Sequence, residues 1–168
     1  MKNYFAIFLS LIFTFTACST DKDKEMFEAA SEMYKANNYT AAVTEYEKLI
    51  NEYPSSEYVE DSYFALAGIY QMGKIPNLSH ADAAKKAVDY YQKFYAQFAN
   101  SENAPKALFM IGFMRANDLN DYDSARISYN EFLKKYPEHE LAPSVKMELD
   151  NLGKTPEQII QQSNTASK

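Results

Sequence analysis

The sequence predicts an all-α protein built from repeated helical hairpins, and three observations support this fold class. In residues 38–54, apolar side chains recur at helical spacing between a polar cap and a proline. Residues 121–137 match this stretch almost position for position, and residues 84–99 are a weaker middle copy. Fourteen Tyr and eleven Phe against four Gly indicate helices that pack through aromatic rings. Recurrence at this scale is typical of stacked helical hairpins.

The length and net charge of the chain restrict its domain count and the classes of partner that it can bind. A chain of 168 residues is enough for one domain of ordinary size. Its net charge of −6, without a long run of Lys or Arg, argues against a nucleic-acid binder, which needs a concentrated basic face.

Residues 1–17 have the pattern of a secretory signal peptide. Lys2 gives a positive start, residues 4–15 form an apolar core, and small residues precede Cys18. The apolar segment is too short for a comfortable membrane span. We therefore exclude it from the fold.

The stretch 15–18 resembles a bacterial lipobox, in which the cysteine is lipidated and becomes the mature N-terminus. The resemblance implies acylation of Cys18, and two or more acyl chains anchor a protein stably. Ser19 follows, which by the sorting rule of enteric bacteria favours the outer membrane. We expect a lipid anchor on its periplasmic face, with the cell surface as the alternative, and a polar leader over residues 18–24. An ordinary signal peptide cut near a cysteine is the competing interpretation.

Helical elements follow from residue 25. Apolar residues recur at three and four positions up to Met33, and Asn38 or Thr40 is expected to cap the next helix, which Pro54 ends. Ser55 and Ser56 are placed to cap the helix after it.

Small and aromatic residues recur in the second helix of each hairpin. The sets are Ala42, Tyr46 and Pro54; Ala87, Tyr91 and Ala99; and Ala125, Tyr129 and Pro137. They resemble the tetratricopeptide repeat, in which small residues let two helices approach and the aromatic ring fills the gap beside them. The resemblance implies a right-handed α-solenoid of about three and a half hairpins over residues 25–153. The repeats lie near 25–54, 58–99 and 103–137, with a capping helix at 141–152.

Two segments lie outside the repeat pattern. Residues 73–79 are an insertion ahead of a capping box made by Ser79 and Asp82. The insertion is either a tolerated loop or a partner-binding element that uses Ile75 and Leu78. Residues 154–168 are expected to form a tail, with one short turn ending at Gln161 and disorder beyond it.

The linkers after residues 53, 98 and 136 share one frame. In this they resemble the envelope lipoproteins of the β-barrel assembly machinery's D subunit, BamD, and the periplasmic repeat protein of the Tol–Pal system, YbgF. The resemblance implies protein partners in the cell envelope, either outer-membrane assembly subunits or cell-wall proteins.

The residues that could perform catalysis are dispersed. His80 and His139 lie far apart in the chain, and carboxylates such as Glu131 alternate with lysines at helical spacing. Phosphate-binding glycine loops and nucleophile elbows are absent from the sequence. We therefore expect no enzyme activity, no metal site and no cofactor.

Binding is expected on the first helices of the hairpins, which line the concave side of such stacks. The predicted peptide- or partner-binding groove consists of Phe27, Tyr34, Lys35, Phe64, Gln71, Phe109, Phe113 and Asn117. Lys24 and Lys106 are expected at its edge. The alternative is that the rings belong to the core. Three functions follow: an outer-membrane assembly scaffold, a receptor for extended peptides, and a cell-wall or division scaffold.

The lipid anchor is directly testable. Cells fed radiolabelled palmitate should incorporate label into the wild-type protein and lose it in the Cys18→Ala variant, because the thiol carries the acyl group. An unlabelled wild type, or equal labelling of the two proteins, would refute the anchor.

Overall fold

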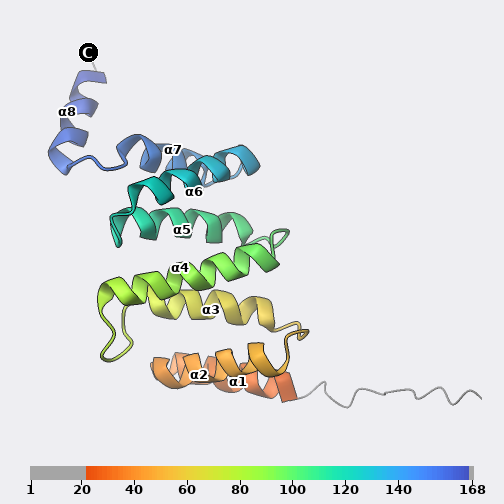
Figure 1. Ribbon diagram of the computed structural model, residues 1–168. Coiled ribbons are helices and arrows are strands. Elements are labelled where there is room, and N and C mark those ends of the chain that lie inside the picture. The colour runs from red at the N-terminus through yellow and green to blue at the C-terminus, as the bar shows by residue number, and fades with distance from the viewer. Residues whose placement is uncertain (1–21, 167–168) are drawn as a thin grey trace, which may run out of the picture.

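The computed structural model describes residues 22–166, and within them the regular structure is entirely helical (Figure 1). The helices are α1 (Lys22–Lys35), α2 (Tyr39–Glu52), α3 (Val59–Gln71), α4 (His80–Gln97), α5 (Ala104–Asn117), α6 (Tyr122–Lys135), α7 (Ala142–Asn151) and α8 (Pro156–Ala166). The predicted all-α class is confirmed.

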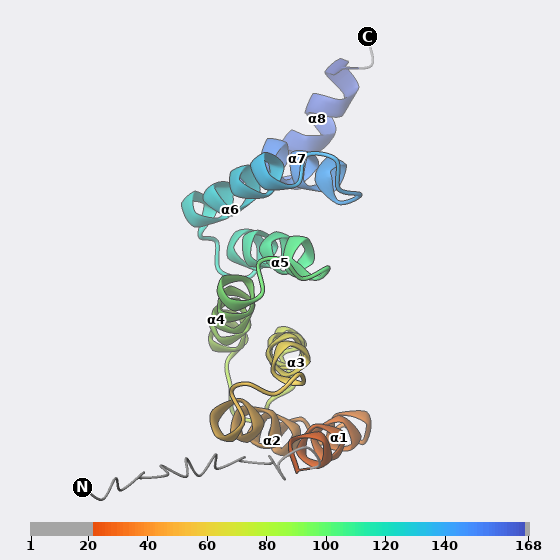
Figure 2. The same ribbon diagram turned by 90° about the vertical axis from the view of Figure 1, so that its right-hand side faces the viewer.

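The helices stack as hairpins along one axis. The pairs α1–α2, α3–α4 and α5–α6 form successive layers, and α7 covers the last one (Figure 1). Figure 2 shows α1, α3, α5 and α7 on one side of the stack and α2, α4 and α6 on the other. We call these the first-helix face and the second-helix side. The arrangement is a tetratricopeptide-type solenoid, as the spacing of small and aromatic residues predicted.

Side-chain caps start the second helix of every hairpin. The Asn38 side chain accepts a hydrogen bond from the Ala41 amide at 3.4 Å, and Ser79 Oγ accepts one from the Asp82 amide at 3.1 Å. Asp121 does the same for α6, accepting from the Ser124 amide at 3.2 Å. Such bonds satisfy amides that a helix N-terminus leaves unpaired. The predicted caps at Asn38 and Ser79 are confirmed.

The helix α3 starts differently from its prediction. It has no capping side chain, and its N-cap is Tyr58. Ser56 lies two residues before this N-cap, and its hydroxyl accepts a hydrogen bond from the Tyr58 amide at 3.2 Å. The serine therefore shapes the linker before the helix instead of capping the helix itself.

Small residues hold the two helices of each hairpin together. Ala30 and Ala67 on the first helices are fully buried, as are Ala42, Ala87 and Ala125 on the second helices. In the third hairpin the close approach is visible directly, because a Cβ added to Gly112 would lie 2.6 Å from the Tyr129 ring. The absence of side-chain bulk at these positions lets the tyrosine rings enter the core.

The buried side chains form two apolar clusters that meet in α5. The first takes in both early hairpins together with Ala107, Ile111 and Met114 of α5. The second combines Leu108 and Ala116 of α5 with the buried side chains of α6 and α7. One helix therefore contributes to both clusters and connects the early hairpins to the end of the stack.

Tyrosines of α4 bridge the second helices. The Tyr90 hydroxyl donates to the Glu47 carboxylate on α2, and the Tyr95 hydroxyl donates to Glu131 on α6 at 3.1 Å. Lys135 donates to the Tyr95 hydroxyl at 2.8 Å and lies 2.9 Å from Glu131. Burial raises the pKa of Tyr95 to about 12, and the lysine holds the pKa of Glu131 below its usual value. The bridge between Tyr95 and Glu131 therefore keeps a neutral phenol beside an ionised carboxylate at neutral pH.

The insertion at residues 73–79 packs against the protein. Ile75 and Leu78 are partly buried against the first apolar cluster. At the end of the loop, His80 Nε2 lies 2.9 Å from the Asp118 carboxylate, which follows α5. The two apolar side chains thus anchor the loop, which favours the structural interpretation over partner binding.

Two helices extend beyond their predicted limits. The helix α1 begins at Lys22, inside the expected leader of residues 18–24, with Asp23 and Glu25 in its first turn, where carboxylates stabilise a helix. The helix α8 runs to Ala166, past the predicted end at Gln161. Its start is stabilised because the Thr155 amide donates to the Gln158 side chain at 2.8 Å, and the Gln158 amide donates back to the Thr155 hydroxyl at 3.4 Å.

The predicted signal peptide and the lipidation site at Cys18 lie outside the described residues. Among the helices that are described, none combines the length and apolar character needed to cross a membrane.

Two glycines provide a matched test of the hairpin contact. We expect Gly112→Ala to lower the free energy of unfolding by about 1–2 kcal/mol, because the clash with the buried Tyr129 ring outweighs the gain in helix propensity. Gly68→Ala has open space around the new methyl group, so it should stabilise by about 0.5–1 kcal/mol. Urea unfolding of both variants measures the difference. Equal effects at the two sites would contradict the close approach.

The first-helix face as a candidate binding site

All eight predicted groove residues lie on α1, α3 or α5, and these helices form the first-helix face (Figure 2). Phe27, Phe64, Phe109 and Phe113 are half-buried, whereas Tyr34, Lys35, Gln71 and Asn117 are exposed. The predicted set therefore divides into packed rings and accessible, mostly polar side chains.

Three of the four half-buried rings pack against the tyrosine of their own hairpin, and the fourth, Phe113, packs against Phe109. Phe27 meets Tyr46 edge to face at 5.8 Å, and its other neighbour, Tyr58, stacks on it at 5.0 Å between ring centroids. Phe64 lies 5.5 Å from Tyr91. These contacts give the rings a structural role, and aromatic pairs of this geometry add stability beyond the area they bury.

The third hairpin repeats this packing. Phe109 lies 6.3 Å from the Tyr129 ring and 5.9 Å from Phe113. Phe113 is thus in contact with a first-helix ring, and it also accepts a hydrogen bond through its carbonyl oxygen from Asn117 at 3.0 Å.

The exposed members make local contacts that leave part of each side chain accessible. Tyr34 is 41% exposed and meets Tyr39 at 5.8 Å. Lys35 pairs with Glu32 at 2.8 Å on the same helix. The Gln71 carbonyl oxygen accepts the Tyr91 hydroxyl proton at 2.8 Å.

Lysines that were expected at the groove edge are placed beside rings or carboxylates. Lys106 Nζ lies 5.2 Å above the Phe64 ring, a cation–π contact, and Lys24 lies 3.8 Å from Glu28. Exposed pairs of this kind contribute little to stability. Both lysines are nevertheless exposed to solvent.

The buried tyrosines of the three hairpins differ in their hydroxyl partners. The Tyr46 hydroxyl lies 3.1 Å from Ser31 Oγ, and Tyr91 donates to Gln71. Tyr129 is fully buried, and its hydroxyl has no hydrogen-bond partner among the described residues. Burial, with the Glu148 carboxylate nearby, raises the pKa of Tyr129, so its phenol is neutral.

Sequence reasoning assigned Tyr129 to packing alone. The aligned first helices do indicate that the Tyr129 hydroxyl lacks a partner, because Ala116 occupies the position in the third hairpin that Gln71 occupies in the second. The substitution removes the side chain that would satisfy the tyrosine.

Hollows on the second-helix side were not predicted. A cavity of about 210 Å³ lies beside Glu47, Tyr63 and Tyr90, and one of about 280 Å³ lies beside Tyr95 and Glu131. Both adjoin the tyrosine–carboxylate bridges. Their walls come from residues far apart in the sequence, which is why spacing alone did not reveal them.

Among the described residues, no group of three His, Cys, Asp or Glu side chains lies close enough together to hold a metal ion. The arrangement supports recognition through exposed polar groups beside aromatic rings.

Alanine variants separate packing from binding on this face. We expect Phe64→Ala to lower the free energy of unfolding by roughly 2 kcal/mol, since the ring is half-buried against Tyr91 and Phe94. Phe109→Ala should behave similarly because of its contact with Tyr129. Tyr34→Ala should cost less than about 1 kcal/mol, as befits an exposed side chain. Thermal unfolding measures all three. An undiminished stability of Phe64→Ala would show that its ring is free for a ligand.

Comparisons with known proteins agree with this architecture. The C-terminal tetratricopeptide-repeat domain of an FK506-binding protein from Plasmodium falciparum superposes with a TM-score of 0.51 at 14% sequence identity, over 88% of this chain and 93% of that one. At this identity the likeness shows the fold alone. No curated protein matches the sequence. The model of the YfiO family, described as outer membrane lipoprotein, matches residues 19–155. This match covers most of the chain and confirms the predicted resemblance to the D-subunit lipoproteins: the chain belongs to the YfiO family of outer-membrane lipoproteins.

Proposed function

We propose that this protein is a non-enzymatic scaffold, anchored through Cys18 to the periplasmic face of the outer membrane, that binds proteins of outer-membrane assembly. The observation that carries the proposal is the family match, which begins at residue 19, directly after the proposed lipidation site. A covalent anchor is required because the chain has a net charge of −6 and would be repelled by anionic lipid.

The first-helix face supports a protein partner. Its exposed side chains include a tyrosine and a lysine near the N-terminal end of the stack, Tyr34 and Lys35. Tyrosine is enriched at interfaces because it combines a large apolar ring with a polar hydroxyl. The half-buried rings below form a rigid base, which lowers the entropy cost of binding.

A receptor for extended peptides is the second candidate. The favouring observation is that Gln71 and Asn117 are exposed on first helices, where Gln71 accepts the Tyr91 hydroxyl proton and Asn117 donates to the Phe113 carbonyl. Gln71 thus keeps its NH₂ group as a donor and Asn117 keeps its oxygen as an acceptor, and a peptide backbone can pair with both kinds of group.

Affinity capture from solubilised envelopes tests the proposal. The wild-type lipoprotein should recover the barrel-forming assembly subunit, and the Tyr34→Ala/Lys35→Ala variant should recover about tenfold less, because a contact tyrosine is commonly worth more than 1 kcal/mol. Ile127→Ala is the matched control, since this residue is 67% exposed but lies on α6, on the second-helix side.

The control variant should capture as much as the wild type, and all three proteins should unfold at similar temperatures. Recovery of cell-wall synthases in place of the assembly subunit would replace the proposed partner with the cell-wall alternative. Equal capture by both variants would remove the binding role from the first-helix face.

A further inference from the structure

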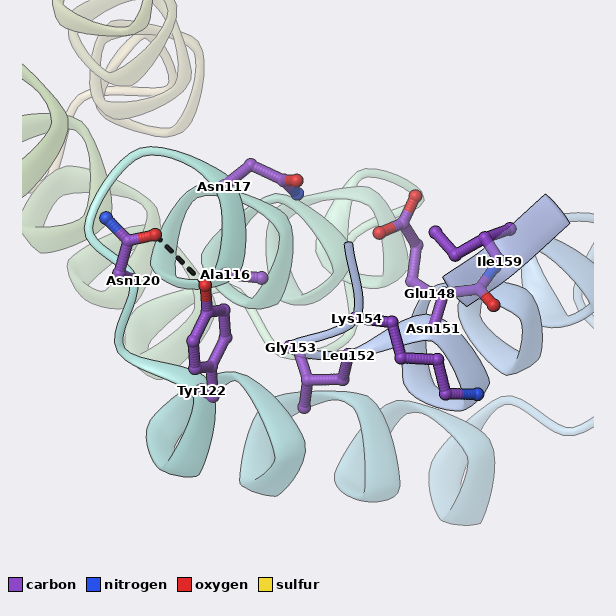
Figure 3. Close-up of a pocket in the computed structure, with 10 residues that line it drawn as sticks. All are labelled: Ala116, Asn117, Asn120, Tyr122, Glu148, Asn151, Leu152, Gly153, Lys154 and Ile159. Carbon is purple, nitrogen blue, oxygen red and sulfur yellow. Dashed lines mark hydrogen bonds between the residues drawn. The ribbon is translucent and has the colours of Figure 1, made fainter. Parts of the chain in front are cut away.

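A polar pocket of about 320 Å³ opens at the C-terminal end of the stack (Figure 3). Its walls come from three places: the end of α5 with the loop after it, the end of α7, and the start of α8. The volume is large enough for a small ligand or for one side chain of a larger one. Of the predicted groove residues only Asn117 lines it, so the pocket is distinct from the site at Tyr34 and Lys35.

Glu148 of α7 lines this pocket as a half-buried carboxylate. Its side chain takes part in none of the hydrogen bonds or ion pairs formed among the described residues. Carboxylates that are partly removed from water are usually paired, because burial costs them hydration. The pocket therefore contains an anionic acceptor whose counter-ion does not come from the described part of the chain.

Two helix ends and a carboxamide make the pocket more favourable for a cation. The helix α5 ends at Asn117 and α7 ends at Asn151, and both residues line the pocket. Carbonyl groups at a helix C-terminus carry partial negative charge, which stabilises a nearby cation. The Asn117 side chain donates its NH₂ group to the Phe113 carbonyl at 3.0 Å, which leaves its oxygen as an acceptor. Asn117 and Glu148 thus offer two acceptors from different walls (Figure 3).

Lys154 also lines the pocket without pairing with Glu148. In Figure 3 the two side chains extend in opposite directions, and the carboxylate of Glu148 is turned towards the side of the pocket that carries Asn117. The space between Asn117 and Glu148 is therefore not taken by this lysine.

We infer that this pocket binds a primary alkylammonium group, namely the side chain of a lysine in a partner polypeptide. The ammonium donates one hydrogen bond to the Glu148 carboxylate and one to the Asn117 oxygen, and its third proton stays with water. Ala116 and Leu152 line the pocket and provide apolar contact for the methylene stem. The lining contains one carboxylate, which matches the single charge of a lysine better than the two charges of a free diamine.

Metal ions and anions fit the pocket less well. A hard cation such as Ca²⁺ takes about six to eight oxygen ligands, and no cluster of three candidate ligand side chains occurs in the described part of the chain. An anion would lie beside the carboxylate of Glu148. The start of α8 does not offset this, because Thr155 and Gln158 already cap it with reciprocal hydrogen bonds.

The pocket and the site at Tyr34 lie at opposite ends of the stack (Figure 1). A failure to bind lysine here and a failure to capture an assembly subunit are therefore separate outcomes.

NMR titration of the full lipoprotein, labelled with ¹⁵N in a nonionic detergent, tests the site. The probe is Nα-acetyl-lysine N-methylamide, titrated into the millimolar range. Its Nε-acetyl derivative keeps the stem and removes the charge, and cadaverine represents a free diamine. The lysine probe should shift the backbone signals of Asn117 and Gly153 saturably. The Nε-acetyl probe should bind about tenfold more weakly or less, since a charge-assisted hydrogen bond is lost, and cadaverine should bind no more tightly than the lysine probe.

Glu148→Gln keeps the shape of the side chain and removes its charge. It should weaken binding of the lysine probe about tenfold or more and leave the unfolding temperature within about 2 °C of the wild type, because the carboxylate has no partner to lose. Asp150→Asn is the matched control, since it removes the same charge from an exposed position of the same helix that does not line the pocket. Its binding should stay within about twofold of the wild type. Lys154→Gln should tighten binding about twofold, because a like charge leaves the wall.

Binding of the lysine probe that is lost in Glu148→Gln and kept in Asp150→Asn supports the site. Equal binding by folded Glu148→Gln and the wild type, equal binding of the charged and the Nε-acetyl probe, or no binding of the lysine probe would overturn it. Binding of cadaverine alone would overturn lysine as the ligand. If Glu148→Gln does not fold, the comparison of the two lysine derivatives on the wild-type protein decides.

Discussion

The approach of two helices across small residues is the contact on which the rest of the structure depends. Where Ala or Gly occupies the facing positions, a tyrosine ring can enter the hairpin, and Gly112 beside Tyr129 shows how little space remains. The ring in turn supports the first-helix phenylalanines, which contact Tyr46, Tyr91 and Tyr129 in successive layers. The first-helix face therefore rests on the tyrosines, and a change in the hairpin contact reaches this face through a single layer of side chains.

Local sequence signals predicted the fold because each acts within one hairpin. The recurrence of Ala and Tyr gave the phase of the repeats, and Asn38 and Ser79 gave the start of two helices through bonds to amides three residues away. The start of α1 was missed because its polar first turn resembles a linker, and the end of α8 was missed because the sequence after Gln161 is polar and lacks a helical apolar pattern. The bridges from Tyr90 to Glu47 and from Tyr95 to Glu131 were also missed, since they join residues about 40 positions apart by geometry alone.

The candidate sites divide in the same way. Helical phase placed the predicted groove residues on first helices, but it could not separate half-buried rings from exposed side chains, because both occur at the same spacing. The unpaired Tyr129 hydroxyl depends on an exception to the repeat, namely Ala116 in place of Gln71. Repetition identifies a family and its architecture, but it does not predict the positions at which one repeat differs from the others. Here the difference is concentrated in the third hairpin.

The tyrosine–carboxylate bridges have a mechanical consequence. They join α4 to its neighbours on both sides and hold the spacing of the second helices nearly constant. If the solenoid bends, the distances between α2, α4 and α6 change little, and the hairpins rotate about this side of the stack. The distances between helices then change mainly on the opposite side, where α1, α3 and α5 move apart or closer together. Bending of this kind would leave the contacts inside each hairpin intact.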